Sequence, residues 1–413
     1  MNEQKKLVPK LRFPEFREFQ AWHPCKLSDA CEVNPSSPIL PDQFVYIDLE
    51  SVEAGKLIAK KIVKKNEAPS RAQRVLNEGD VIFQMVRPYQ RNNFFFQEND
   101  NSSYVASTGY AQLRAKDSPE FLFQVVHVDD FVDRVIAKCT GSSYPAINSS
   151  DLAEVPLLVP SPNEQQKIAD CLSSLDELIA AQARKVEALK THKKGLMQQL
   201  FPREGETQPR LRFPEFQDAG PWKLRKIGSQ LVEAQRPIAL SDEAEYRLVT
   251  VKRRYGGLVS RGVMKGREIL VKSQFLVSMG DFLISKRQIV HNACGLVPAE
   301  LDGSVVSNEY SVLTPKGDCS IDFFSWFAMQ PSVSASFMNC SVGIVIEKML
   351  FKLPAWLKQE FLFPNLQEQE RIASCLDTFG GLITSANQEL DTLKTHKKGL
   401  MQQLFPSVEA VEA

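Results

Sequence analysis

The amino-acid sequence contains an internal duplication. The hexapeptide Leu-Arg-Phe-Pro-Glu-Phe occurs at 11–16 and again at 211–216, and Trp22 recurs as Trp222 at the same offset of 200. Residues 164–202 then match residues 368–406 without a gap at 22 of 39 positions, and both segments end in KTHKKGLMQQLFP. A solenoid repeat has a period of about 20–50 residues. The chain is therefore interpreted as two duplicated domains, each followed by the same connector.

Both connectors have the spacing of coiled-coil helices, because apolar residues recur at alternating steps of four and three. In the first connector these positions are Ile168, Leu172, Leu175, Ile179, Gln182, Val186, Leu189, Lys193, Leu196 and Leu200. In the second they are Ile372, Leu376, Phe379, Ile383, Ala386, Leu390, Leu393, Lys397, Leu400 and Leu404. Such sustained spacing favours a coiled coil over an ordinary amphipathic helix. Because a globular domain separates the two helices, we expect them to pack antiparallel on each other.

The stretches 25–160 and 225–360 have diverged, and each has short apolar runs separated by turn residues such as Gly55 and Gly79. The predicted strands are Phe44–Leu49, Val81–Val86, Tyr104–Leu113, Tyr246–Val251, Phe282–Ser285, Val305–Ser307 and Tyr310–Leu313. Helices are predicted near Phe121–Ile136 and Ile321–Ser336. The predicted fold class is α+β, with two globular domains joined by two long antiparallel coiled-coil helices in a pseudo-two-fold internal repeat. Near-identical connectors and domain starts around diverged domain interiors indicate two domains that recognise different targets on one common scaffold. The alternative is sequence drift in loops that have no function.

Polar residues gather after the turns Gly79-Asp80 and Gly280-Asp281, and again near Thr140 and Lys252. Arg, Asn and Gln form paired hydrogen bonds to base edges, and Ser and Lys hold phosphates, although solvated loops have a similar composition. The candidate DNA-binding residues of the first half are Arg87, Tyr89, Arg91, Asn92, Ser142, Ser143 and Tyr144. Those of the second half are Lys252, Arg253, Arg254, Lys286, Arg287, His291 and Asn292.

The composition restricts the class of protein more than it restricts the partner. The 50 basic and 50 acidic residues balance, so net charge gives no argument for nucleic acid, although a neutral chain can carry a basic face. The eight cysteines show no Cys-x-x-Cys spacing, which favours structural thiols over a zinc site or a disulfide framework. The start of the chain has no signal peptide and no apolar run is long enough to span a membrane, so we expect a cytoplasmic protein.

Several catalytic motifs are missing from the sequence, including a Walker loop and a Gly-x-Ser-x-Gly elbow. Asn34-Pro35-Ser36-Ser37 departs at its third position from the Asn/Asp-Pro-Pro-aromatic tetrapeptide of amino-methyltransferases. Glu53-Ala54-Gly55-Lys56 has one residue too many for the acidic-x-Lys pattern of a nuclease. We therefore expect a chain that binds rather than reacts.

Two variable domains alternating with two near-identical helices resemble the specificity (S) subunit of type I restriction–modification enzymes. The resemblance rests on the helix starts Glu164–Ala169 and Glu368–Ala373 and on the shared KTHKKGLMQQLFP ends. Further supporting positions are Gly79-Asp80, Arg87–Tyr89, Thr140–Pro145, Tyr246–Gly257, Gly280–Lys286 and Val306–Tyr310. The second half departs at Cys340–Gly343, where the first half has Thr-Gly-Ser-Ser-Tyr-Pro, so the resemblance implies no equivalent base contacts there.

The resemblance implies a non-catalytic subunit that reads a bipartite sequence in double-stranded DNA, with an unread spacer set by the helices. The implied domains are target-recognition domain 1 (1–160), helix 1 (161–202), target-recognition domain 2 (203–365), helix 2 (366–406) and a tail (407–413). Two methyltransferase (M) subunits would dock on the helices, and two restriction (R) subunits would join them. The candidate partner-binding residues are Leu172, Leu175, Ile179, Leu376, Phe379 and Ile383. No cofactor is expected on this chain, because S-adenosylmethionine, ATP and Mg²⁺ would bind the partner subunits.

Two other function classes remain open at this point. One is a self-contained enzyme, such as a nuclease, with an unrecognised site, which would cleave duplex DNA without any partner. The other is a coiled-coil scaffold with protein-binding domains, which would show no salt-dependent affinity for DNA.

Overall fold

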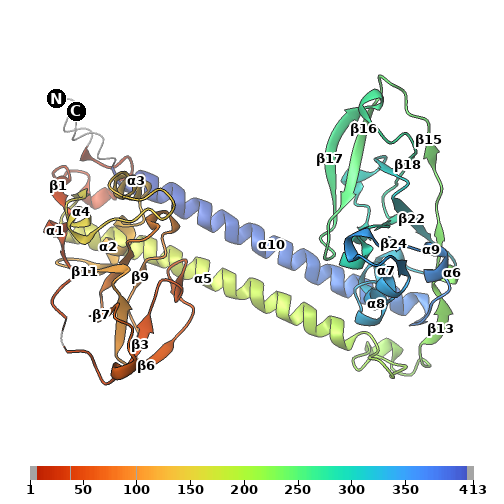
Figure 1. The fold of residues 1–413 in the computed structure, drawn as a ribbon, viewed down its shortest axis with the longest axis horizontal. Coiled ribbons are helices and arrows are strands. Elements are labelled where there is room, and N and C mark those ends of the chain that lie inside the picture. Colours follow the sequence, from red (N-terminus) through yellow and green to blue (C-terminus); the bar gives the residue numbers. More distant parts are fainter. Residues whose placement is uncertain (1–6, 38, 99, 407–413) are drawn as a thin grey trace. The chain divides into compact units, whose positions relative to one another are not determined.

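The computed structural model describes residues 7–37, 39–98 and 100–406, which form two compact units (Figure 1). The first unit contains the chain up to Arg184 together with the chain from Gln388 onward, and the second contains Lys185–Asn387. Each unit thus combines one globular domain with a part of both long helices. The predicted tail at 407–413 lies outside the described residues.

The first unit contains two four-stranded sheets. One sheet is antiparallel, in the order β2 (Cys31–Val33), β11 (Tyr110–Ala115), β8 (Val81–Gln84) and β9 (Phe94–Phe95). The other has the order β6 (Lys61–Lys64), β3 (Gln43–Ile47), β10 (Tyr104–Ser107) and β7 (Ala72–Val75), with β3 and β10 parallel. A ribbon of β1 (His23–Lys26) and β12 (Pro156–Val159) joins the beginning of the domain to its end. The shorter elements are α1 (Leu27–Ala30), β4 (Val52–Glu53), β5 (Lys56–Leu57) and α4 (Ser149–Ala153).

The second unit repeats this strand order although its sequence has diverged. Its antiparallel sheet has the order β14 (Leu231–Glu233), β22 (Tyr310–Pro315), β19 (Phe282–Ser285) and β20 (Cys294–Leu296). Its second sheet has the order β15 (Pro237–Ile238), β18 (Gln274–Leu276), β21 (Val305–Ser307), β16 (Glu245–Val251) and β17 (Leu258–Lys265), again with one parallel pair, β16 and β21. The ribbon is formed by β13 (Lys223–Lys226) and β25 (Glu360–Phe363). The shorter elements are α6 (Ile227–Gln230), β23 (Ser341–Val342), β24 (Leu350–Phe351) and α9 (Leu353–Trp356).

The expected α+β fold is confirmed, with corrections to three elements. The predicted strand Tyr104–Leu113 is two strands, because the chain turns between Ser107 and Tyr110. The two predicted helical stretches are each two helices, α2 (Pro119–Val125) with α3 (Asp129–Ala137), and α7 (Ile321–Phe327) with α8 (Pro331–Asn339). In the second unit, Pro331 forces the break, because a residue before proline avoids the helical region and Gln330 is extended.

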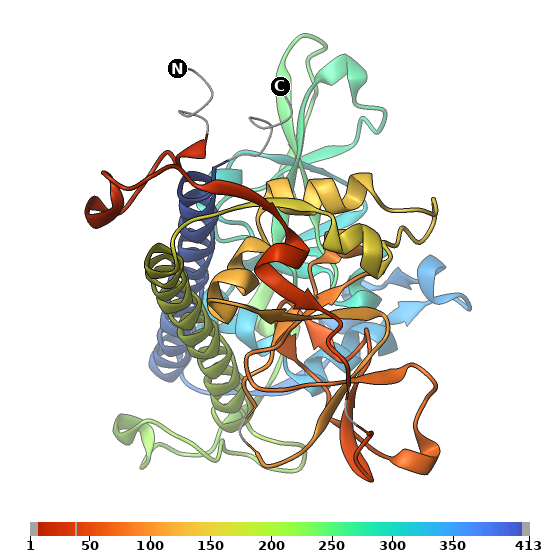
Figure 2. The ribbon, with the colours of Figure 1, turned by 90° about the vertical axis from the view of Figure 1, so that its left-hand side faces the viewer.

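The two long helices, α5 (Pro162–Gln199) and α10 (Leu366–Leu404), run side by side and antiparallel within each unit (Figures 1 and 2). In the first unit, the Nζ of Lys397 lies 2.7 Å from Asp176 of α5, and Gln182 donates to Glu389 at 2.8 Å. The residue number of the contact on α10 decreases as the residue number on α5 increases, which shows that the two helices are antiparallel. Every position of the predicted apolar spacing is buried or partly buried, including the polar Gln182 and both lysines.

A buried ion pair fixes the beginning of α5 to the repeated hexapeptide. Arg12 donates from Nε and Nη2 to the two carboxylate oxygens of Glu164 at 2.8 and 2.7 Å, and also to the carbonyls of Phe19 and Gln20. The indole of Trp22 donates to the same carboxylate at 3.3 Å. Both charged side chains are at most 7% exposed. A paired and fully hydrogen-bonded charge pair can be buried, and Glu164 also lies at the positive end of α5.

The same hexapeptide also holds the end of the other helix. The amide of Leu11 donates to the carbonyl of Gln403 at 3.0 Å, and the ring of Phe405 packs edge-on against Trp22. The second unit repeats every one of these contacts. Its ion pair is Arg212 with Glu368, its indole is Trp222, and its helix-end contacts are Leu211 with Gln199 and Trp222 with Phe201. One short segment in each unit therefore binds the start of one long helix and the end of the other.

We predict that Glu164→Gln lowers the free energy of unfolding of the first unit by about 3 kcal/mol, because Arg12 then stays buried without a counter-charge. The measurement is differential scanning calorimetry of the whole chain. The matched control is Glu15→Gln, whose ion pair with Lys167 is about half exposed, and we expect it to cost less than about 0.5 kcal/mol. Equal effects of the two substitutions would contradict the anchoring role of Glu164.

Candidate nucleic-acid interface

In the first unit, the structure joins two polar segments that lie far apart in the sequence. The amide of Ile147 donates to the carbonyl of Met85 at 3.1 Å, and the amide of Arg87 donates to the carbonyl of Pro145 at 2.7 Å. Arg87 has the left-handed backbone conformation, with φ of 55°. This turn sets the segment Arg87–Asn92 against the exposed loop Thr140–Tyr144.

The joined segments present an arginine and two tyrosines to solvent. The guanidinium of Arg87 lies over the ring of Tyr144, 4.2 Å from its centroid, and Tyr144 is 64% exposed. Tyr89, Ser142 and Ser143 are also exposed. Stacking on an aromatic ring orients the planar guanidinium and leaves its N–H groups free for paired acceptors, such as a guanine edge or a phosphate.

Arg91 and Asn92, which the sequence also suggested for DNA contact, are engaged inside the unit. Arg91 donates to Asp129 at 2.6 Å and to the carbonyl of His127 at 3.0 Å. The side-chain oxygen of Asn92 accepts from the amide of Ala54. These bonds hold both side chains beside the loop that carries Arg87, and their contact with DNA stays a prediction.

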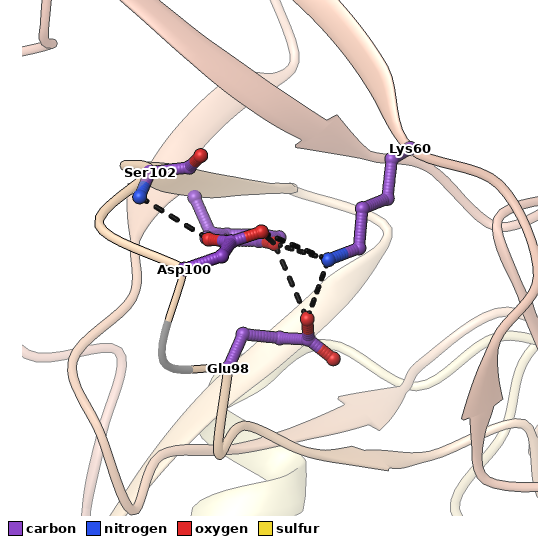
Figure 3. A network of polar contacts seen from close by, with 5 residues as sticks. Lys60, Glu98, Asp100 and Ser102 are labelled. Atoms are coloured by element: carbon purple, nitrogen blue, oxygen red, sulfur yellow. Dashed lines mark hydrogen bonds and ion pairs between the residues drawn. The ribbon is translucent and has the colours of Figure 1, made fainter.

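The lysine-rich stretch 56–65 was not singled out from the sequence, and two of its lysines are neutralised by neighbouring carboxylates. The amine of Lys60 lies 2.6 Å from Glu98, 2.9 Å from Asp100 and 2.8 Å from the hydroxyl of Tyr104 (Figure 3). Its hydrogen bond to Glu98, more than any other contact, raises the pKa of Lys60, and the hydrogen bond from Tyr104 lowers the pKa of Asp100. Lys61 pairs with Asp48 in the same way. These contacts tie the loop before β10 to the neighbouring strands.

His127 lies behind the Arg87 loop, between α2 and α3. Its Nδ1 is 2.7 Å from the carbonyl of Phe123, and its ring packs against that of Phe123. Burial, together with the nearby cations Lys397 and Arg91, lowers the pKa of His127 to about 4. The imidazole is therefore neutral at pH 7.

In the second unit, a tight turn brings two candidate segments together. Arg254 and Tyr255 both have left-handed backbones, and their amides donate to the carbonyls of His291 and Asn292 at 2.8 and 2.9 Å. The hydroxyl of Tyr255 donates to the carbonyl of Ala328 at 3.0 Å, which fixes the turn to the end of α7. Lys252, Arg253 and Arg254 are all exposed on this turn.

Other candidates in the second unit are held by internal contacts. Lys286 donates to the carbonyl of Asn308, Arg287 pairs with Glu309, and Arg253 donates to Gln288. The side-chain oxygen of Asn292 accepts from Ser334. His291 is partly buried, and its Nε2 has no hydrogen-bond partner within the described part of the chain. Lys252 and Arg254 are thus the cationic candidates whose side chains form no hydrogen bond or ion pair with the described residues.

The partner-binding residues expected on the helices need a correction. Leu172 and Leu376 are fully buried, each in the core of its own unit, so a partner cannot touch them directly. Leu175, Ile179, Phe379 and Ile383 are partly buried in the same apolar spacing. Leu178 and Leu382, which the sequence analysis does not name, are 54% and 49% exposed and occupy the same repeat position. The sequence contains a signal for this pair of leucines. Leucine is kept at this position in both copies of the repeat, whereas residues 176, 177, 180 and 181 differ from their counterparts in the second copy.

Other kinds of site find little support in the described ranges. Residues 7–406, apart from 38 and 99, contain no group of three or more His, Cys, Asp or Glu side chains placed to hold a metal ion. The same residues include no helix that is both long and apolar enough to cross a membrane. All eight cysteines are free thiols, and burial raises the pKa of Cys25 to about 11.

Residues 21–191 match the family model of the type I restriction modification DNA specificity domain. These residues, which make up less than half of the chain, are similar to the type I specificity domain. Two relatives are the type I restriction enzyme HindI specificity subunit of Haemophilus influenzae, 26% identical over 33% of this chain, and the MjaIX specificity subunit of Methanocaldococcus jannaschii, 28% identical over 29%. The matched segments span 30% of the length of each relative.

A solved structure of a specificity-family member has the same fold. The type I restriction–modification S subunit from M. genitalium has a TM-score of 0.56 and 13% identity, with 97% of this chain and 99% of that chain covered. The α+β class with two long helices is therefore that of a solved family member, although the two sequences have diverged widely.

The pKa of His127 predicts acid sensitivity of the first unit. The unfolded chain takes up a proton near pH 6.5 and the folded unit only near pH 4, so stability is full above pH 6.5 and falls as the pH drops toward 4. The loss is at most about 3 kcal/mol. We expect His127→Asn to flatten this part of the melting-temperature profile, with His23→Asn on the exposed strand β1 as the matched control. A slope as steep in His127→Asn as in the wild type would exclude this histidine as the cause.

Proposed function

We propose that this chain is the DNA-recognition subunit of a type I restriction–modification enzyme and that each unit reads one half of a split sequence in double-stranded DNA. The observation that carries this proposal is the duplicated topology with different exposed polar loops. The first unit displays Arg87 with Tyr144, whereas the second displays Lys252 and Arg254 on a left-handed turn. One scaffold that carries two different loop sets is suited to reading two different half-sites.

The chemistry of these loops supports contact with both phosphates and base edges. The arginines supply forked donors, the lysine supplies a point charge for phosphate, and Tyr144 offers an apolar face. The left-handed conformations at Arg87 and Arg254 define the backbone turns from which these side chains project, and a turn that is formed before binding reduces the entropy that binding costs. The neutral net charge agrees with a subunit that shares phosphate contacts with its partners.

We predict that Arg87→Ala weakens binding to the cognate duplex by about 1–3 kcal/mol, the value of one paired contact to a base. The measurement is fluorescence anisotropy at fixed salt concentration with the assembled complex. Arg17→Ala, which removes an exposed arginine from the same unit, is the control. If the affinity of Arg87→Ala for the duplex is unchanged, Arg87 does not contact DNA and is an ordinary solvated residue.

We propose that methyltransferase subunits dock on the outer faces of the long helices, with Leu178 and Leu382 as equivalent contact points. A single exposed leucine is common on protein surfaces. These two are notable because the repeat retains them between residues that have changed. Two equivalent points, one in each unit, agree with two M subunits, on which two R subunits would assemble. S-adenosylmethionine, ATP and Mg²⁺ would then be bound by those subunits, with no catalytic role for this chain.

We expect Leu178→Asp combined with Leu382→Asp to abolish coelution with the methyltransferase subunit on gel filtration, because each change places a charge in an apolar contact. Both side chains are exposed in the free chain, so folding should be preserved. Leu224→Asp, at a position 63% exposed on β13, is the control. Undiminished coelution of the double variant would rule out these leucines as docking points.

We also propose that the helices set the length of the unread spacer, because α5 and α10 each run uninterrupted from one unit into the other. Inserting one heptad into each helix adds about 10.5 Å and retains the apolar spacing. At about 3.4 Å per base pair, the spacer should lengthen by roughly three base pairs while both half-sites stay the same. The added pairs rotate one half-site by roughly 100°, so activity is expected to fall. The readout is the methylated motif, and an unchanged spacer from a folded, active variant would refute the proposal.

A further inference from the structure

The two units differ most in one loop that follows equivalent helices. In the first unit, the loop after α3 ends where the amide of Ile147 bonds to the carbonyl of Met85. In the second unit, the loop after α8 ends where the amide of Phe351 bonds to the carbonyl of Lys286 at 2.9 Å. The two loops therefore occupy the same place in the topology, next to the polar segment that follows β8 or β19.

The chemistry of the two loops is opposite. The first contains exposed Thr140, Gly141, Ser142, Ser143 and Tyr144. The second exposes four β-branched apolar side chains within five residues: Val342 is 63% exposed, Ile344 is 103%, Val345 is 50% and Ile346 is 47%. Single exposed apolar residues are normal, whereas a contiguous group of this kind marks a contact surface.

The apolar loop is held away from the core by its own base. β23 and β24 pair as a hairpin, and the amide of Lys352 donates to the carbonyl of Cys340 at 2.9 Å. Phe351 is buried and anchors the hairpin to the core of the second unit. Gly343 has φ of 151°, and an added Cβ would lie 2.9 Å from the Cα of Met349, so the two sides of the loop approach closely. The exposed residues are therefore displayed on a supported hairpin.

The surroundings of the loop favour duplex DNA as its occupant. The hairpin is hydrogen-bonded to Lys286, which lies two residues before Gln288, the partner of Arg253. The turn that carries Arg253 also exposes Lys252 and Arg254. Lys286 and Arg287 add two more cations next to this turn. Within the described chain, Arg287 is the one cation of these five that pairs with an acidic residue, Glu309. An apolar tip beside cationic side chains fits a ligand that is anionic outside and apolar between its stacked bases.

We propose that Val342–Ile346 forms an apolar wedge that inserts between two base pairs of the half-site read by the second unit. This inference rests on the DNA-binding function proposed above. Isoleucine and similar side chains enter base steps in other DNA-bending proteins, and the cost of unstacking is offset by the contacts that bent DNA permits. The first unit, with its polar loop, reads its half-site without a wedge.

The test uses the full chain assembled with its methyltransferase subunit and duplexes that carry the motif found by methylation sequencing. 2-Aminopurine is placed in turn at each position of both half-sites except the methylated adenine, since methyltransferases flip their target base. The variants are Ile344→Ser/Val345→Ser and the control Leu270→Ser/Val271→Ser, which removes two other exposed apolar residues from the same unit.

The wedge predicts a rise in fluorescence at one step of one half-site on binding, which disappears in Ile344→Ser/Val345→Ser together with about tenfold or more of the affinity. The control variant should behave as the wild type. Equal fluorescence in the wild type and Ile344→Ser/Val345→Ser, or weaker binding with no fluorescence rise in the wild type, would overturn the wedge. Loss of methyltransferase binding in that variant would assign the loop to a protein contact and overturn it as well. Failure of the wild-type complex to bind any duplex would refute the proposed function itself.

Discussion

The buried ion pair between Arg12 and Glu164, repeated as Arg212 and Glu368, is the contact on which the rest of the structure depends. In each unit it connects the repeated hexapeptide at the beginning of the domain to the start of the long helix that ends the domain. The neighbouring leucine amide holds the end of the other helix. Because a buried charge pair loses much of its value when either partner moves, the contact determines how the helices enter the domain. The near-identical parts of the repeat are the parts that make these contacts.

The repeated contacts at the helix ends leave the loops between strands free to differ between the two units. Apart from the added edge strand β15, both units have the same order of strands in their main sheets, including one parallel pair. The loops after β8 and β19 nevertheless present different groups to solvent. In the first unit the presented group is an arginine stacked on a tyrosine. In the second it is a basic turn beside an apolar hairpin. Change can accumulate in such loops without cost to the core, which is what the proposed recognition of two separate half-sites requires.

The sequence predicted those features that depend on spacing and repetition. The two helices, their antiparallel packing and the strands near the Gly-Asp turns follow from periodicity and from turn residues. The sequence did not predict that Leu172 and Leu376 are inside the chain, because an apolar spacing shows which face is buried but not whether the same chain or a partner covers it. Arg91 illustrates a second limit. Its type suggested DNA contact, but its role depends on Asp129, 38 residues away, which only the fold brings close.

The central claim is that this chain makes a methyltransferase recognise a split DNA sequence. Methylation sequencing of genomic DNA tests that claim most directly, in cells that carry this chain with its methyltransferase subunit and in cells that carry the methyltransferase subunit alone. The expected result is a single new methylated motif made of two short specific halves separated by unspecific bases, present only when this chain is expressed. A continuous motif, or no new methylation from a complex shown to assemble, would contradict it.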